Sequence, residues 1–211
     1  MNERETVAAL LDRHGTTYAE EAGITLRDTP APLYRLLVLT VLCSVRIGAG
    51  IAVAAARELH ADGLDTPRRM AGARRATLIS AFGRAHYVRY DESTATALTD
   101  GAELLLRRWH GDLRRLRDEA DGDSERVGGL VQEFPRIGPV GSAIFRREAQ
   151  AVWPSLRPFF DERARKEARL LGLPDDPTAL AALADPARLA AALTRASLEH
   201  LGAEDLERTA A

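Results

Sequence analysis

Apolar residues recur along most of this chain at the three-to-four-residue spacing of an amphipathic helix. Residues 3–22 carry Val7 and Leu10 on one side, which predicts a first helix. Residues 33–45 are apolar on nearly every side, so they predict a helix buried in the centre of a bundle. No segment has the alternating pattern of a convincing strand. The pattern therefore predicts an all-α protein.

Breakers and capping residues divide the rest of the chain. Residues 28–32 form a proline-containing breaker. Thr66-Pro67, Asp176-Pro177 and Asp185-Pro186 each combine an N-cap with a proline at the first helical position. We expect roughly ten helices and a fraying tail from residue 202, with the further helices near residues 51–60, 67–71, 75–82, 91–108, 113–117, 127–134, 139–152 and 162–171.

The composition also favours an all-α protein, and it excludes several kinds of site. Only 5% of residues are aromatic, and Ala and Leu dominate the 45% that are hydrophobic. The single cysteine, Cys43, excludes an internal disulfide and any four-cysteine metal or iron–sulfur site, and its apolar helix predicts an inert thiol. No His, Asp or Glu grouping has metal-ligand spacing, so we expect no metal and no cofactor. The most apolar run, residues 36–45, is too short to cross a bilayer and no signal peptide is evident, which predicts a soluble cytoplasmic protein.

Charge is distributed unevenly although the net charge is only −2. Residues 34–172 hold 23 of the 29 basic and 18 of the 31 acidic side chains, while both ends are acidic. A basic centre suits a local phosphate-binding surface, and ordinary scatter of charge on solvated helices explains it equally well. All basic side chains are arginines except Lys166.

The sequence at 130–145 predicts two helices joined by a tight turn. A short helix must end at Pro135, Ile137-Gly138 makes the turn, and Gly141-Ser142-Ala143 opens a second helix with small residues. Backbone N–H groups at the start of that second helix would form a cradle for a phosphate.

Three stretches resemble the helix–hairpin–helix DNA glycosylase superfamily that includes endonuclease III. Leu130-x-x-x-Phe134-Pro135-x-Ile137-Gly138 resembles its Leu-Pro-Gly-Val-Gly hairpin, and Phe160-Asp161 with the later Ala168–Leu173 resembles its Val-Asp and Arg-Leu-Gly-Leu. The helix ending Leu42–Arg46 looks like the family's second barrel helix. The resemblance spans about residues 30–173.

The resemblance implies a two-lobed fold. Residues 29–150 would form a six-helix barrel-like lobe containing the hairpin, at about 130–145, and residues 1–28 with 151–211 the second helical lobe. Double-stranded DNA would lie in the cleft between them, with no membrane partner. We expect a monomer that associates with the nucleoid.

The implied activity is that of a monofunctional DNA glycosylase, a hydrolase of base excision repair that removes a damaged base, an alkylated one being a candidate. Two departures limit it: Arg136 replaces the hairpin's first glycine, and Val140 stands where bifunctional members have lysine. Lys166, the only lysine, lies more than a helical turn beyond Asp161, so we expect no lyase step. The alternative is a catalytically inactive helix–hairpin–helix DNA-binding protein; a helical adaptor for other proteins is a third class.

Asp161 is the predicted catalytic residue, because a carboxylate stabilises the oxocarbenium character that develops when the C1′–N bond breaks. Its alternative role is to cap the helix that follows. Arg46 is the predicted wedge beside an extruded base, or simply an arginine that ends a helix.

The remaining candidates are contacts to DNA. His86, Tyr87 and Tyr90, with Trp109, could stack on a flipped base, although such clusters more often belong to a core. Arg146 and Arg147 could instead pair with Glu148 or be solvated, and Glu133 is expected to face solvent. The predicted DNA-binding set is Arg46, Arg136, Ile137, Gly138, Val140, Gly141, Arg146 and Arg157.

Overall fold

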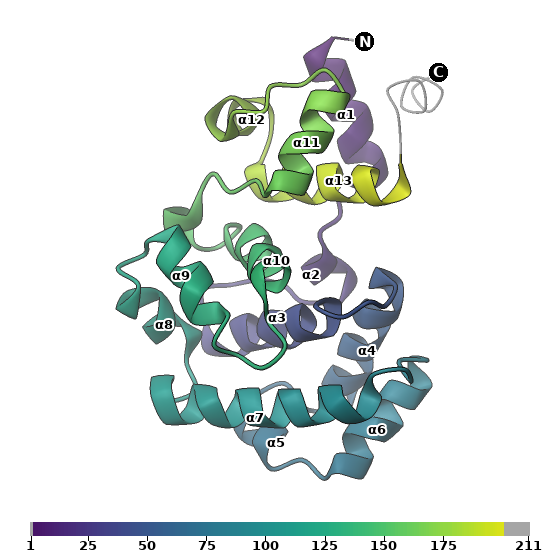
Figure 1. Cartoon of the computed structure of the whole chain (residues 1–211), viewed down its shortest axis with the longest axis vertical. Coiled ribbons are helices and arrows are strands. Elements are labelled where there is room, and N and C mark those ends of the chain that lie inside the picture. The colour runs from purple at the N-terminus through teal and green to yellow at the C-terminus, as the bar shows by residue number, and fades with distance from the viewer. Residues whose placement is uncertain (1, 201–211) are drawn as a thin grey trace. The chain divides into compact units, whose positions relative to one another are not determined.

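The computed structural model describes residues 2–200, and within that range it contains helices and no strand (Figure 1). The all-α prediction is confirmed. Two compact units are present. The larger one is residues 19–146, and the smaller one joins the chain up to Tyr18 to the chain from Arg147 onward.

The predicted lobes divided the chain at residues 28/29 and 150/151, whereas the units divide it at 18/19 and 146/147. The second division falls inside α10, the helix Pro139–Ala149. The barrel-like arrangement of six helices and the DNA cleft stay predictions.

The larger unit is centred on α3 (Pro30–Cys43), whose residues from Leu36 to Leu42 are all buried, as its all-round apolar pattern predicts. It packs against α4, α7 and α8. The other helices of this unit are α2 (Tyr18–Glu21), α4 (Ala49–Ala61), α5 (Pro67–Ala71), α6 (Arg75–Arg84), α7 (Asp91–Trp109), α8 (Leu113–Glu119), α9 (Ser124–Val131) and the start of α10.

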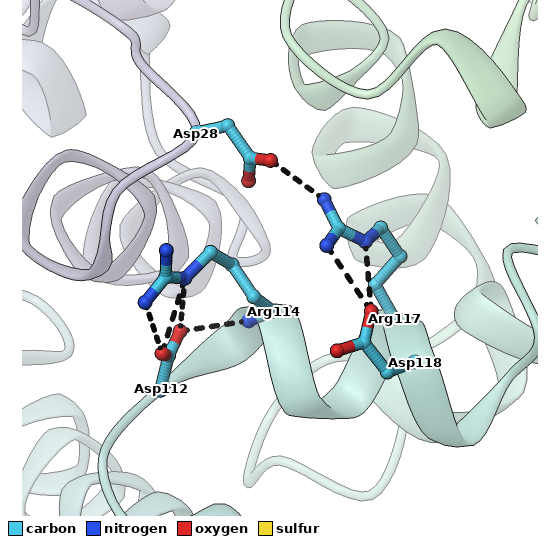
Figure 2. A network of polar contacts seen from close by, with 5 residues as sticks. All are labelled: Asp28, Asp112, Arg114, Arg117 and Asp118. Atoms are coloured by element: carbon cyan, nitrogen blue, oxygen red, sulfur yellow. Dashed lines mark hydrogen bonds and ion pairs between the residues drawn. The ribbon is translucent and has the colours of Figure 1, made fainter.

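A group of arginine–carboxylate contacts holds α8 in the larger unit, as Figure 2 shows. Arg117 on α8 pairs with Asp28, which precedes α3, at 2.8 Å, and with Asp118 at 3.1 Å. Asp112 caps α8 by accepting from the Arg114 amide at 3.0 Å and also pairs with the Arg114 guanidinium at 2.7 Å. The hydrogen bond from Arg114 lowers the pKa of the Asp112 carboxyl.

The smaller unit has its core around α13, which packs against both α1 and α11. Asp176 and Asp185 accept from Ala179 and Arg188 amides at 2.9 and 3.0 Å, so both predicted N-caps are confirmed. The helices of this unit are α1 (Glu3–His14), the 3₁₀ helix η1 (Pro154–Leu156), α11 (Glu162–Leu170), α12 (Pro177–Leu183) and α13 (Pro186–Glu199).

Several helices end earlier than predicted. The predicted helix 3–22 stops at His14, where Gly15 donates back to the Leu11 carbonyl at 2.7 Å and a Cβ at position 15 would strike that oxygen. Helix α9 ends at Val131 rather than Phe134, because the last residues tighten into turns. Local sequence patterns locate helices better than they locate helix ends.

Two tyrosines of the larger unit differ in how their hydroxyls are satisfied. Tyr34 and Tyr87 are 2% and 0% exposed. The Tyr87 hydroxyl lies 3.2 Å from the Thr94 hydroxyl and 3.4 Å from the Leu42 carbonyl. Within residues 2–200 the Tyr34 hydroxyl has no hydrogen-bond partner, and burial raises the pKa of Tyr34.

We therefore expect Tyr34→Phe to leave the free energy of unfolding unchanged or to raise it, because the variant removes a buried hydroxyl that bonds to nothing in the described structure. Tyr87→Phe should lower it by about 1 kcal/mol, because it breaks two contacts. Urea titrations of the three proteins measure the difference. An equal loss in both variants would contradict this account of Tyr34.

Candidate nucleic-acid interface

The turn between α9 and α10 is built around a left-handed residue. Arg136 has φ of 68°, a conformation that glycine adopts more readily than arginine. Ile137 is buried and its amide donates to the Phe134 carbonyl at 3.1 Å. The Gly138 carbonyl accepts from the Ser142 amide at 2.9 Å and so starts α10. The amide of Ile137 is therefore occupied and cannot serve as a phosphate donor.

The amides that follow the turn have no internal acceptor. Those of Gly138, Val140 and Gly141 donate to nothing within residues 2–200, as expected at the first turn of a helix. Gly138 is exposed and Val140 is 73% exposed, whereas Gly141 is buried. Gly138 and Val140 thus supply the accessible part of the predicted phosphate cradle.

Helices α9 and α10 touch closely through a glycine. The Ser142 hydroxyl donates to the Gly128 carbonyl at 3.0 Å, and a Cβ at position 128 would lie 3.0 Å from the Ser142 hydroxyl and from the Arg146 guanidinium carbon. Arg146 itself donates to Ser124 and Glu125 of α9, at 3.3 and 2.6 Å. Its side chain is only 11% exposed, so we reassign it from phosphate binding to holding the two helices together.

The hairpin also rests on the end of α3. A Cβ at position 141 would collide with the Ser44 hydroxyl, which donates to the Thr40 carbonyl at 2.6 Å. Arg46 follows Ser44 by two residues, so its backbone lies within about 7 Å of this contact. Arg46 is exposed and makes no hydrogen bond or ion pair with any described residue. The backbone of Arg46 therefore lies close to the point where the hairpin contacts the end of α3.

Aromatic stacking fixes the base of the hairpin. Phe134 stacks on Trp109 of α7, with ring centroids 5.5 Å apart, and both side chains are buried. The Trp109 indole donates to Glu119 at 2.6 Å, and Arg108 pairs with both Glu119 and Glu133. Trp109 is therefore a core residue. Glu133 is exposed, as expected, and forms an ion pair with Arg108.

The predicted base-stacking residues have three different environments. Tyr87 is fully buried, packs on Phe82 with centroids 5.1 Å apart, and presents no face to a base, so we correct its role to a structural one. His86 is exposed, with φ of 57°. Tyr90 is half-buried, and the guanidinium carbons of Arg89 and Arg136 lie 5.3 and 5.7 Å from the centroid of its ring.

Asp161 belongs to the smaller unit and uses both of its oxygens. One oxygen accepts from the Ala164 amide at 2.9 Å and caps α11, while the other pairs with Arg147 at 2.9 Å. The side chains of Arg147 and Asp161 are 2% and 16% exposed. Arg147 also donates to the Thr194 hydroxyl at 3.3 Å, and its Nε has no partner within residues 2–200. The capping role of Asp161 is confirmed, and its catalytic role stays a prediction.

Arg147 was expected to pair with Glu148, to be solvated or to contact phosphate, and the structure places it elsewhere. Its partner Asp161 lies 14 residues further along the chain and belongs to another helix. A buried arginine could have been suspected from its position among apolar residues of α10, but the identity of the partner could not. This ion pair is the principal feature that the sequence did not reveal.

Other candidates lie at the periphery. The Arg157 guanidinium donates to the carbonyls of Gln150 and Ala151, so it caps the end of α10, and a phosphate contact by its remaining N–H groups stays a prediction. Lys166 is exposed on α11.

Among residues 2–200 no three His, Cys, Asp or Glu side chains gather as a metal site would require. In the same range no helix is long and apolar enough to cross a bilayer, and the apolar α3 has only 14 residues.

Comparison of the chain with models of protein families, with curated proteins and with solved structures finds no match. The arguments below therefore use the geometry of this chain.

The contact between Gly141 and Ser44 gives a stability prediction. Gly141→Ala should lower the free energy of unfolding by about 1–2 kcal/mol, because Ser44 must give up its bond to Thr40. Gly129→Ala is the matched control: this helical glycine of α9 has open space at its Cβ, and alanine there should stabilise by about 0.5–1 kcal/mol. Chemical denaturation measures both.

A second control separates the collision from a loss of hairpin flexibility. Ser44→Ala should recover much of the loss in the Gly141→Ala background, because it removes the atom that is struck. Equal stabilities for Gly141→Ala and Gly129→Ala would contradict the close approach.

Proposed function

We propose that this protein binds duplex DNA through the α9–α10 hairpin, with a backbone phosphate at the exposed start of α10. The observation that carries the proposal is the left-handed turn at Arg136, which leaves the Gly138 and Val140 amides without acceptors beside two arginines. Amide donors and the helix dipole favour an anion at this point.

The charges around the hairpin support the same function. Arg46 is exposed and unpaired within the described chain, and Arg136 contacts Tyr90 instead of a carboxylate. Most other arginines of the larger unit that the structure pairs, such as Arg75, Arg84 and Arg117, have a carboxylate partner. Contacts to phosphate fix position on DNA without reading its sequence, so we expect binding to many duplexes.

Base excision is the second candidate function, and the Arg147–Asp161 pair is the observation that favours it. The pair sets an Asp161 oxygen 2.9 Å from the Arg147 guanidinium, and a carboxylate is the kind of group that stabilises an oxocarbenium ion. Excision of a damaged base, an alkylated one being a candidate, would proceed without a lyase step, because Val140 offers no amine. A binding protein without catalysis is the alternative, since both Asp161 oxygens already have structural partners.

DNA binding is tested by fluorescence anisotropy with a labelled duplex over a range of salt concentrations. Arg46→Ala should raise Kd about 3- to 10-fold and reduce the slope of log K against log salt by about 0.9, as loss of one phosphate contact does. Arg107→Ala is the matched control: it removes the same charge from α7, at a position that, like Arg46, is exposed and has no ion pair within residues 2–200.

The control should bind like the wild type. No binding of duplex at 50 mM salt or equal effects of the two substitutions would contradict the proposed site.

Excision is tested with duplexes that carry uracil, 8-oxoguanine, 3-methyladenine or a mismatch, followed by alkali to cleave abasic sites. Asp161→Asn should lower the rate of product formation by about 100-fold or more, because asparagine keeps the cap and loses the charge. Asp176→Asn alters another capping aspartate of the smaller unit and should keep full activity.

Borohydride should trap no covalent complex. Binding without alkali-labile product across the panel would leave the binding function and remove the enzymatic one.

A further inference from the structure

We infer that Tyr90 and Ser93 hold the Arg136 side chain ready as a phosphate ligand, so that they act as positioning residues for DNA binding. The inference rests on the proposed function and adds to it a side chain that complements the backbone amides. Its basis is the contact of the hairpin with the start of α7.

Two contacts restrain the Arg136 guanidinium. Nη1 donates to the Ser93 hydroxyl, which itself donates to the Tyr90 carbonyl at 3.1 Å. The guanidinium carbon lies 5.7 Å from the centroid of the Tyr90 ring, within the range of a cation–π interaction. A hydrogen bond from one edge and a ring against the guanidinium together limit a side chain that is otherwise rich in rotamers.

The restrained guanidinium still has donors to give. Arginine has five N–H bonds, and Ser93 is the only hydrogen-bond acceptor of Arg136 within residues 2–200. Four donors therefore remain on a residue that precedes Gly138 by two positions, and the amides of Gly138 and Val140 have no acceptor within residues 2–200. A phosphodiester oxygen matches this set, because guanidinium groups and helix N-termini both bind phosphate.

No acidic side chain within residues 2–200 forms a hydrogen bond or an ion pair with Arg136. Asp91 accepts from the Glu92 amide at 2.7 Å within the first turn of α7. Glu92 is engaged by Arg75, whose Nε donates to it at 2.6 Å. Arg89, whose guanidinium carbon lies 5.3 Å from the centroid of the Tyr90 ring, adds a second positive charge near this ring.

Positioning and direct contact leave different signatures in the dependence of binding on salt. A residue that contributes charge to a phosphate changes the slope, whereas a residue that only preorganises its neighbour changes affinity at constant slope. Tyr90 carries no charge, so the two roles can be separated by measurement.

The experiment compares duplex binding by wild type, Arg136→Ala, Tyr90→Ala, Tyr90→Phe and Ser93→Ala across salt concentrations. Arg136→Ala should raise Kd about 5- to 20-fold and lower the slope by about 0.9. Tyr90→Ala and Ser93→Ala should raise Kd about 2- to 5-fold with the slope unchanged, and Tyr90→Phe, which keeps the ring, should bind like the wild type. Thermal unfolding of each variant checks that it is folded.

A double variant gives the decisive result. In the Arg136→Ala background, Tyr90→Ala should have no further effect, because no guanidinium remains to be positioned. An undiminished effect there would overturn the inference and indicate that Tyr90 touches DNA itself. Wild-type affinity in Arg136→Ala would overturn it as well, while absence of duplex binding by the wild type would instead remove the proposed function.

Discussion

The hairpin depends on close contacts at two glycines, where a side chain would push neighbouring atoms away. Gly128 lets α9 approach α10 closely enough for the Ser142 hydroxyl to reach a backbone carbonyl, and Gly141 lets α10 rest on Ser44 at the end of α3. With these contacts in place, the direction of α10 and the location of its first amides are set by backbone packing. The exposed loop residues then need little stabilisation of their own.

The smaller unit relies on a different kind of interaction. Arg147 is almost fully buried, and without Asp161 its charge would lack a counterion in an apolar environment. Such pairs contribute little net stability when intact, but loss of either partner is costly. The pair therefore ties the start of α11 to Arg147 within the smaller unit, independently of whether Asp161 also acts on a substrate.

Local signals in the sequence predicted the helices well. Asp176 caps its helix through the neighbouring amide, as a cap followed by proline indicates, and the apolar run of α3 is buried on all sides. The site was harder to predict because it depends on contacts distant in sequence. Tyr87 and Tyr90 are three residues apart, yet only packing against α3 and α7 decides that one is buried and the other contacts arginines.

The left-handed conformation of Arg136 makes this position a point of conflict between folding and binding. Glycine would relieve strain of about 1 kcal/mol at such a φ, and a sequence selected for stability alone would place it there. Arginine retains the strain together with a guanidinium directed at Tyr90 and Ser93. Under the proposed function, a more stable protein obtained by changing this residue would bind DNA less tightly, so that stability and binding would make opposite demands on the hairpin.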